Sequence, residues 1–232
     1  RDDLLKCALL GFLNPCLYYI ILFKGYDALP AQEAMVINFS WPVMLVILSI
    51  PILKQTIDLK SFLSIIVCYF GVVVIATNGD IFSMQFENPF GVFLMLISTV
   101  IWSLFWLFNT KNSHDSLVSL FLIFLFSFPF ILGFVVLTNS FIIPSLEGLI
   151  GSIYIGFFEM GISLVLWQSA LKISTTVSRV ASLVFITPFL SLIILYLVLG
   201  EKILISTITG IILICVGLLL QKYFTNKATK NS

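Results

Sequence analysis

The polar side chains inside long apolar segments are the residues of this chain that could bind a solute, and Glu159 is the most costly of them. A carboxylate at the centre of a membrane helix costs about 2.5–3.5 kcal/mol on insertion scales, so we expect it to face water, a partner or a substrate. Glu159 could carry a proton, or it could pair with the amino group of a substrate. The structural alternative, which stays open, is that Glu159 only bonds to a neighbouring helix.

Other polar and aromatic residues share single helix faces when the segments are projected at about 100° per residue. The residues on these faces are Asn14 and Tyr18 in the first segment, Asn38 and Trp41 in the second, Trp102 in the fourth, and Glu159, Ser163 and Trp167 in the sixth. Aromatic walls with a few hydrogen-bonding groups are typical of small-molecule sites, so these residues are the predicted substrate-binding set. Membrane tryptophans can instead anchor a helix at the lipid–water interface, and that alternative stays open for Trp102 and Trp167.

The sequence has no motif that would support an enzyme. It lacks the G-x-S-x-G, H-E-x-x-H, Walker and dinucleotide-binding patterns, so neither catalysis nor ATP coupling by this chain is expected. The four cysteines lie inside apolar segments without C-x-x-C spacing. Buried cysteines of this kind act as small hydrophobic residues. We therefore expect no catalytic residue, no metal site, no disulfide and no cofactor.

The composition requires a membrane as solvent. Hydrophobic residues make up 60% of the 232 residues, charged residues make up only 10%, and phenylalanine occurs 23 times. A soluble domain could not solvate such a surface, and each helix that crosses a bilayer needs about 20 apolar residues. Segments of this kind lie at roughly 5–23, 29–53, 60–77, 89–109, 117–138, 147–170, 175–199 and 203–223. The predicted fold is an all-α polytopic membrane protein in which these segments are the helices.

The distribution of charge predicts the orientation. With the N-terminus inside, every basic residue except Lys24 and Lys202 falls on the cytoplasmic side. Because loops rich in Lys and Arg stay in the cytoplasm, both termini are predicted to be cytoplasmic. The net charge is +1 and no basic patch is present, so no nucleic acid partner is expected.

An internal repeat relates two parts of the chain. A shift of 146 residues places Phe39 on Phe185, Pro42 on Pro188 and Gly71 on Gly217. The copies are an odd number of spans apart and so cross the membrane in opposite directions, and inverted repeats are typical of transporters that alternate between two states. A proline inside a helix frees the carbonyl four residues back, which a membrane tolerates only where a cavity, water or a side chain satisfies it. We therefore predict a site or a hinge at Pro42 and Pro188, and packing alone is the alternative that stays open.

The same shift places Glu33 on Arg179, at the predicted starts of the second and seventh spans. We predict that these two residues gate the pathway or attract substrate. The alternative, a helix-end charge that reaches the lipid headgroups, stays open for both, and the helix dipole favours it slightly for Glu33. Glycines in the third and eighth spans, Gly71, Gly210 and Gly217, are expected to allow close helix packing.

The segment Pro30–Pro42 reads Pro-Ala-Gln-Glu-Ala-Met-Val-Ile-Asn-Phe-Ser-Trp-Pro and resembles the fourth helix of EamA-type carriers in the drug/metabolite transporter superfamily. It is most similar to bacterial aromatic amino-acid exporters, in which the matching helix runs Glu-Ala-x-x-Ile-Asn-x-x-Trp-Pro. The segments Ala170-Leu171-Lys172, Pro188 and Leu199-Gly200-Glu201 resemble the ninth and tenth helices of the superfamily. The resemblance covers essentially the whole chain and implies a central cavity between two halves that rock. One departure is Lys54-Gln55, which stands where the second copy has Gly200-Glu201.

A repeat unit of five spans predicts the domain organisation. Residues 1–77 would be the last three helices of the first EamA repeat, 78–88 an outer loop, 89–223 the complete second repeat and 224–232 a cytoplasmic tail. The first copy would then be two helices short, and the chain begins at Arg1 rather than at Met. We expect a fragment of a ten-helix protein, or a chain whose N-terminus is not included.

These observations predict a secondary transporter that exports small amphipathic metabolites, most of all amino acids, by alternating access. The expected partners are a small-molecule substrate and membrane lipid, and proton coupling and a homodimer are left open. The alternatives are uptake or exchange of S-adenosylmethionine or a nucleotide-like metabolite, a non-transporting membrane scaffold and, last, an intramembrane enzyme. An anionic substrate would need more cations in the cavity than Arg179, so nucleotides rank lower.

Overall fold

The computed structural model describes residues 2–84, 88–112, 114–187, 190 and 204–230, and all regular structure in these ranges is helical. The helices long and apolar enough to cross a membrane are Leu4–Ala28, Glu33–Leu53, Leu59–Ala76, Pro89–Thr110, Ser116–Leu137, Leu146–Ile173 and Ile205–Phe224. These 7 spans match seven of the predicted segments and confirm an all-α polytopic membrane protein. The predicted span at 175–199 is described only at residues 175–187 and 190, where it contains α10, and its remaining residues lie outside the described ranges.

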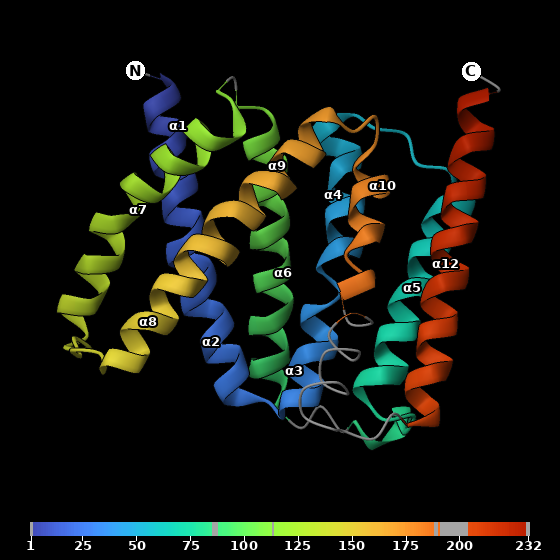
Figure 1. Cartoon of the computed structure of the whole chain (residues 1–232), viewed down its shortest axis with the longest axis horizontal. Helices are drawn as coiled ribbons and strands as arrows, with labels where there is room; N and C mark the ends of the chain where they lie inside the picture. Colours follow the sequence, from blue (N-terminus) through green and yellow to red (C-terminus); the bar gives the residue numbers. More distant parts are fainter. Residues whose placement is uncertain (1, 85–87, 113, 188–189, 191–203, 231–232) are drawn as a thin grey trace. The chain divides into compact units, whose positions relative to one another are not determined.

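The described elements follow one another as helices and short irregular helical stretches (Figure 1). In chain order they are α1 (Asp2–Gly11), η1 (Phe12–Leu17), α2 (Tyr18–Ala28), α3 (Ala31–Asn38), α4 (Trp41–Leu53), α5 (Leu59–Ala76), η2 (Ile81–Ser83), α6 (Pro89–Thr110), α7 (Ser116–Leu137), α8 (Leu146–Tyr154), η3 (Ile155–Ser163), α9 (Leu164–Ile173), α10 (Val177–Leu183) and α12 (Ile205–Lys230). Both η1 and η3 are π-helical, whereas η2 is a 3₁₀ turn. Asp58, Asp115 and Ser145 begin α5, α7 and α8 by accepting hydrogen bonds from backbone N–H groups of the first turn.

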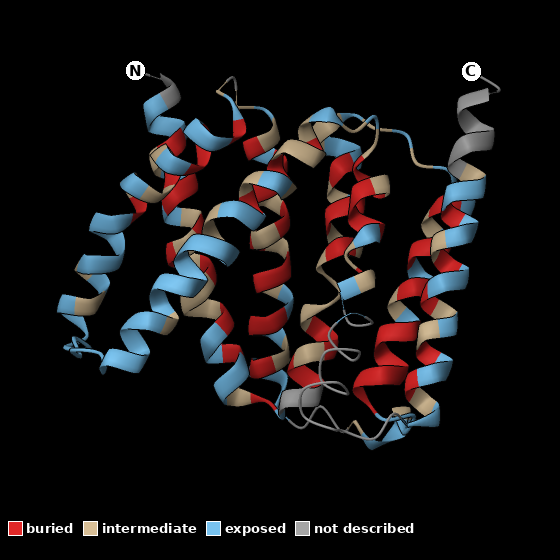
Figure 2. Cartoon of the chain, in the orientation of Figure 1, coloured by how far each residue is buried: buried red, intermediate tan, exposed pale blue. Residues whose placement is uncertain are grey.

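The chain divides into two compact units, and unit 1 consists of residues 1–20 and 108–173. In this unit α1 packs against α7 at Gly11, where a Cβ atom would lie 2.5 Å from the carbonyl oxygen of Ile123. A glycine is therefore needed for the two backbones to approach so closely. Helix α7 also contacts α9, whereas α8 and most of η3 are exposed (Figure 2).

Unit 2 consists of residues 21–107 and 174–232, and its most extensive contact is between α5 and α12, which lie side by side (Figure 1). A Cβ atom at Gly71 would lie 2.7 Å from the carbonyl oxygen of Gly210, and one at Gly217 would lie 2.8 Å from the carbonyl oxygen of Ser64. Membrane helices associate through such small residues because lipid provides no hydrophobic force between them. The close packing predicted for these glycines is confirmed.

The contact between α5 and α12 follows the 146-residue repeat. The pairs Gly71–Gly210 and Ser64–Gly217 exchange under the shift, and their order along the two helices makes α5 and α12 antiparallel. At the centre, the Cys68 thiol donates to the carbonyl oxygen of Ile214 at 3.6 Å, and these two positions are themselves 146 residues apart. The equivalent helices of the two copies therefore pack around a local two-fold axis, as an inverted repeat requires.

A break at Asn38–Trp41 separates α3 from α4. Pro42 therefore lies in the first turn of α4, not inside a continuous helix as the sequence suggests. A proline is tolerated there because the N–H groups of a first turn have no intrahelical acceptor. Its proposed counterpart, Pro188, lies outside the described residues.

Side chains satisfy backbone carbonyls on both sides of this break. The hydroxyls of Tyr69, Ser40 and Ser103 donate to the carbonyl oxygens of Val36, Ile37 and Trp41 at 3.1, 2.6 and 3.2 Å. Two of these donors come from α5 and α6, so packing against other helices stabilises the interruption. This is the condition under which a membrane protein tolerates a broken helix.

Candidate functional site

Three irregular stretches carry or adjoin six of the eight residues predicted to bind substrate, all except Trp102 and Trp167. The stretches are η1 (Phe12–Leu17), the α3–α4 break at Asn38–Trp41, and η3 (Ile155–Ser163). Irregular backbone at membrane depth is tolerated where it is buried in protein or lines a cavity, and π-helical stretches are frequent at functional sites. A solute could meet backbone polar groups at these stretches more readily than along the regular helices.

In η1, Asn14 interrupts the helix with an extended backbone at φ −147° and ψ 125°, and a cis peptide bond joins it to Pro15. The Asn14 side chain is 1% exposed, and its Oδ1 has no hydrogen-bond partner among the described residues. A buried acceptor of this kind is normally satisfied by protein or ordered water, so Oδ1 could accept from a ligand donor. Asn14 is a predicted site residue, whereas the interruption was not predicted, although Pro15 is a sequence signal for it.

Tyr18 and Tyr19 connect η1 to η3 within unit 1. Tyr18 is buried, and its ring meets that of Tyr19 edge to face with centroids 5.0 Å apart. The Tyr19 hydroxyl donates to the Sδ atom of Met160 at 3.4 Å. Because Met160 directly follows Glu159, this contact places Glu159 near the start of α2.

The residues predicted from the sixth segment lie in and after η3. Glu159 and Ser163 are exposed, Trp167 is half-buried, and the Ser163 hydroxyl donates to the carbonyl oxygen of Phe158 at 2.9 Å. The projection onto one face assumes α-helical periodicity, whereas η3 has the wider i→i+5 pattern of a π-helix. The angles of that projection therefore do not apply to residues 155–163, and the shared face of Glu159, Ser163 and Trp167 stays a prediction.

Four rings of unit 2, here called the tryptophan cluster, lie beside the α3–α4 break: Trp41, Trp102, Phe105 and Trp106. Trp102 meets Trp41 edge to face with centroids 6.1 Å apart, and it meets Trp106 at 5.5 Å. Phe105 and Trp106 are fully buried, whereas Trp41 and Trp102 are half-buried, as is Asn38 one turn before Trp41. The i, i+4 spacing places Trp102 and Trp106 on one face of α6, but only Trp102 belongs to the predicted substrate-binding set.

The two charged residues predicted as gates differ in their surroundings within unit 2. Glu33 lies in the first turn of α3 and is 6% exposed, which argues against a side chain that reaches out to headgroups. Arg179 is half-buried in α10 and donates to the Thr175 hydroxyl at 3.2 Å. The two residues are equivalent in the repeat, but Glu33 is buried whereas Arg179 is half-buried and hydrogen-bonded to Thr175.

A polar network in unit 1 was not predicted. The Ser119 hydroxyl donates to Oδ1 of Asn109 at 2.5 Å and accepts from Nδ2 of Asn112 at 3.0 Å. The Lys172 ammonium group donates to the backbone carbonyls of Asn112 and His114. The network ties the ends of α6 and α9 to the start of α7, and its scattered sequence positions carry no recognisable spacing.

Two cavities accompany these elements. One of about 610 Å³ in unit 1 lies between α1 and the end of α6, and one of about 300 Å³ in unit 2 lies between α10 and α12. Among the described residues, Arg179 alone of the predicted site residues lines either cavity. The described residues also bring together no group of three His, Cys, Asp or Glu side chains that could hold a metal ion.

The apolar spans and the interrupted helices define a polytopic membrane protein of the transporter class. Residues 1–77 and 89–221 match the EamA-like transporter family. The chain belongs to this family and is a membrane transporter.

Two relatives agree with this assignment, and a solved structure shares the fold. A protein of Clostridium kluyveri named an uncharacterized transporter is 27% identical over 233 residues, which covers 97% of this chain and 74% of the relative. A protein of Archaeoglobus fulgidus with the same description is 28% identical over 224 residues, which covers 93% of this chain and 76% of that relative. A crystal structure of a protein 16% identical in sequence superposes with a TM-score of 0.82, over 96% of this chain and 78% of the other, and shows the same fold.

Proposed function

We propose that this transporter is a secondary carrier that exports small amphipathic metabolites, most of all amino acids, by alternating access. The observation that carries the proposal is the α3–α4 break beside the tryptophan cluster. Discontinuous membrane helices in carriers place backbone groups and helix ends at the substrate site. We also propose a location in the bacterial inner (plasma) membrane, to which the resemblance to bacterial carriers points, with both termini in the cytoplasm, an orientation that the distribution of basic residues supports.

The unit 2 residues would bind the apolar part of the substrate. Trp41 and Trp102 are half-buried, so their rings can contact an aromatic or aliphatic side chain, or a cationic amino group through its attraction to the ring face. Asn38 adds an amide that can donate and accept. Residues 36–42 and 102–106 contain no basic side chain, so a phosphate would find no countercharge in these segments. This favours an amino acid over a nucleotide.

Within unit 1, Asn14 and Glu159 supply polar groups that could act on an ammonium group or on a proton. The Oδ1 atom of Asn14 is a buried acceptor, and Glu159 carries the only acidic side chain within η3. Either group can accept a hydrogen bond from an ammonium group, and Glu159 can also take up a proton. Movement would occur at the α3–α4 break, with Pro42 at its edge, and at Pro188 in the second copy, while Glu33 and Arg179 gate access.

The test is counterflow by the full chain in proteoliposomes, with labelled amino acids, S-adenosylmethionine and a nucleotide as the panel. We expect accelerated exchange of at least one amphipathic amino acid. Trp102→Ala should reduce that exchange at least about tenfold, which corresponds to the loss of about 1.4 kcal/mol. Phe93→Ala is the matched control, because Phe93 lies on the same helix and is 55% exposed. Exchange of only the nucleotide, or of no panel member by folded protein, would contradict the proposal.

Glu159→Gln tests the role of the carboxylate in the same assay. We expect transport to be lost, or to become independent of an imposed pH gradient, while insertion and folding stay intact. Glu147→Gln in α8 is the control, because it removes an exposed carboxylate from the adjoining helix. Wild-type rates of the Glu159→Gln variant at every pH would remove Glu159 from the mechanism.

A further inference from the structure

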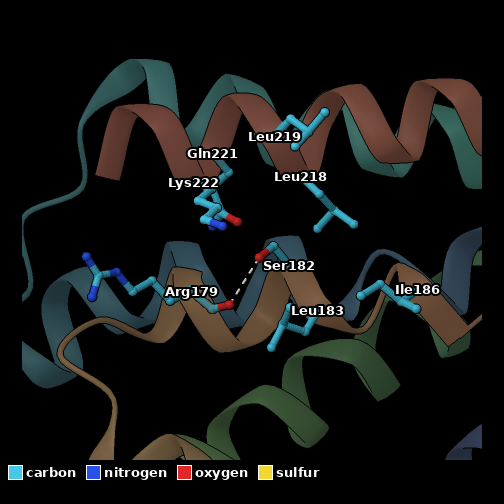
Figure 3. A pocket seen from close by; sticks show the side chains of 8 residues that line it. All are labelled: Arg179, Ser182, Leu183, Ile186, Leu218, Leu219, Gln221 and Lys222. Atoms are coloured by element: carbon cyan, nitrogen blue, oxygen red, sulfur yellow. Dashed lines mark hydrogen bonds between the residues drawn. The ribbon is translucent and has the colours of Figure 1, made fainter. Parts of the chain in front are cut away.

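The cavity between α10 and α12 has one charged end and one apolar end (Figure 3). Arg179 and Lys222 lie toward one end, whereas Ile186 and Leu218 lie toward the other. Its volume of about 300 Å³ is at the lower limit of ligand pockets, which span about 300–1,000 Å³. The arrangement fits a ligand that has an anionic group and an apolar part.

The other polar residues of this groove hold the two helices together. The buried Gln221 donates from Nε2 to the carbonyl oxygen of Ser178, which fixes α12 on α10. The Ser182 hydroxyl donates to the carbonyl oxygen of Arg179 at 3.1 Å. These groups give the groove its shape, and the countercharge for an anion comes from the two basic side chains.

The apolar end continues onto an exposed surface. Leu183 is 56% exposed and Leu219 is 67% exposed, and both line the groove. A hydrocarbon chain could therefore leave the cavity along these two side chains and remain in contact with the protein. A small soluble anion would leave this apolar surface unused.

The first copy of the repeat lacks the corresponding groove chemistry. The positions equivalent to Arg179 and Lys222 are Glu33 and Ala76. There, Val36, Val73 and Ala76 form a buried cluster against which Met35 and Tyr69 pack. The two cations are thus a feature of the second copy, and the repeat as such does not account for them.

We propose that this groove binds one anionic phospholipid of the cytoplasmic leaflet, with its phosphate at the two cations and its acyl chains along the leucines. Both cations lie on the cytoplasmic side in the orientation predicted from the loops. Basic pockets between membrane helices on that side recognise anionic headgroups, and each basic residue contributes to the attraction. The proposal concerns lipid binding and does not depend on the transported substrate.

The test is native mass spectrometry of the full chain in detergent with an equimolar mixture of phosphatidylglycerol and phosphatidylcholine. We expect one phosphatidylglycerol to be retained in preference, and the preference to fall about fivefold for each cation removed by Arg179→Ala or Lys222→Ala. The double variant Lys24→Ala/Lys54→Ala is the matched control for the double variant Arg179→Ala/Lys222→Ala, because it removes two positive charges from residues that do not line the groove. An equal loss in that control would overturn the proposal, as would equal retention of the two lipids by the wild type.

Two further measurements separate a lipid site from a site for any anion. Leu218→Trp should fill the groove and abolish phosphatidylglycerol retention while both cations and the thermal midpoint remain unchanged. Glycerol 3-phosphate should fail to displace the lipid at concentrations at which added phosphatidylglycerol succeeds. Retention by Leu218→Trp, or displacement by glycerol 3-phosphate at those concentrations, would contradict the assignment of a lipid.

Discussion

The α3–α5 pair and the α10–α12 pair of unit 2 are equivalent parts of a duplicated sequence, yet they differ in what lies between the helices. Between α3 and α5, valine, alanine, tyrosine and methionine side chains form a packed cluster, and Tyr69 donates to the carbonyl oxygen of Val36. Between α10 and α12, basic and aliphatic side chains surround a cavity. The two copies therefore keep the same contact between α5 and α12, but they differ in the side chains that α5 presents to α3 and that α12 presents to α10.

The largest effect on stability is expected at the contact between α5 and α12, to which both copies contribute equivalent residues. Gly71→Ala and Gly217→Ala should each destabilise the protein by about 2–3 kcal/mol, because each new Cβ meets a backbone carbonyl that cannot move freely. Denaturant-induced unfolding in detergent would measure both. Gly133→Ala, at a position with nothing within 4 Å, should leave stability within about 0.5 kcal/mol of the wild type. Clearly unequal losses of stability for Gly71→Ala and Gly217→Ala would contradict the symmetry of the α5–α12 contact.

A smaller effect on stability should distinguish the packed α3–α5 pair from the α10–α12 pair, which has a cavity between its helices. Val73→Ala should cost about 1–2 kcal/mol because Val73 is buried and its contacts are lost when the side chain is shortened. Leu219→Ala, at the equivalent position of the second copy, should cost no more than about 0.5 kcal/mol because Leu219 is 67% exposed. The same unfolding assay measures both variants, and equal costs would mean that the second copy is packed in solution as the first is.

The smallest effect on stability concerns one hydrogen bond between α3 and α5. Tyr69→Phe should destabilise the protein by about 0.6–1 kcal/mol, because the bond to the Val36 carbonyl is lost while the ring remains. Amide hydrogen exchange at residues 37–41 would also increase if this bond supports the α3–α4 break. Tyr26→Phe, which removes the hydroxyl of an exposed tyrosine on α2, is the control. Unchanged exchange and stability would show that the break does not depend on α5.

The spans could be predicted because a run of about 20 apolar residues has few alternatives to a membrane helix, and the packing glycines because the repeat matches two of them. The interruption at Asn14 was predictable from Pro15 and was missed. The register of η3 was not predictable, since residues 155–163 contain no proline and a π-helical turn differs little in composition from an α-helical one. The burial of Glu33 also depends on tertiary contacts that its position near a helix start does not reveal.

The Cys68–Ile214 contact has a consequence for the origin of the chain. These positions are equivalent and touch each other at the local two-fold axis. In an ancestor in which the two copies were separate identical polypeptides, this residue would have met itself across an antiparallel homodimer, and each mutation there would have changed both sides at once. A single chain that carries both copies is free of that coupling, and here cysteine on one side meets isoleucine on the other, a pair that a symmetric homodimer could not form.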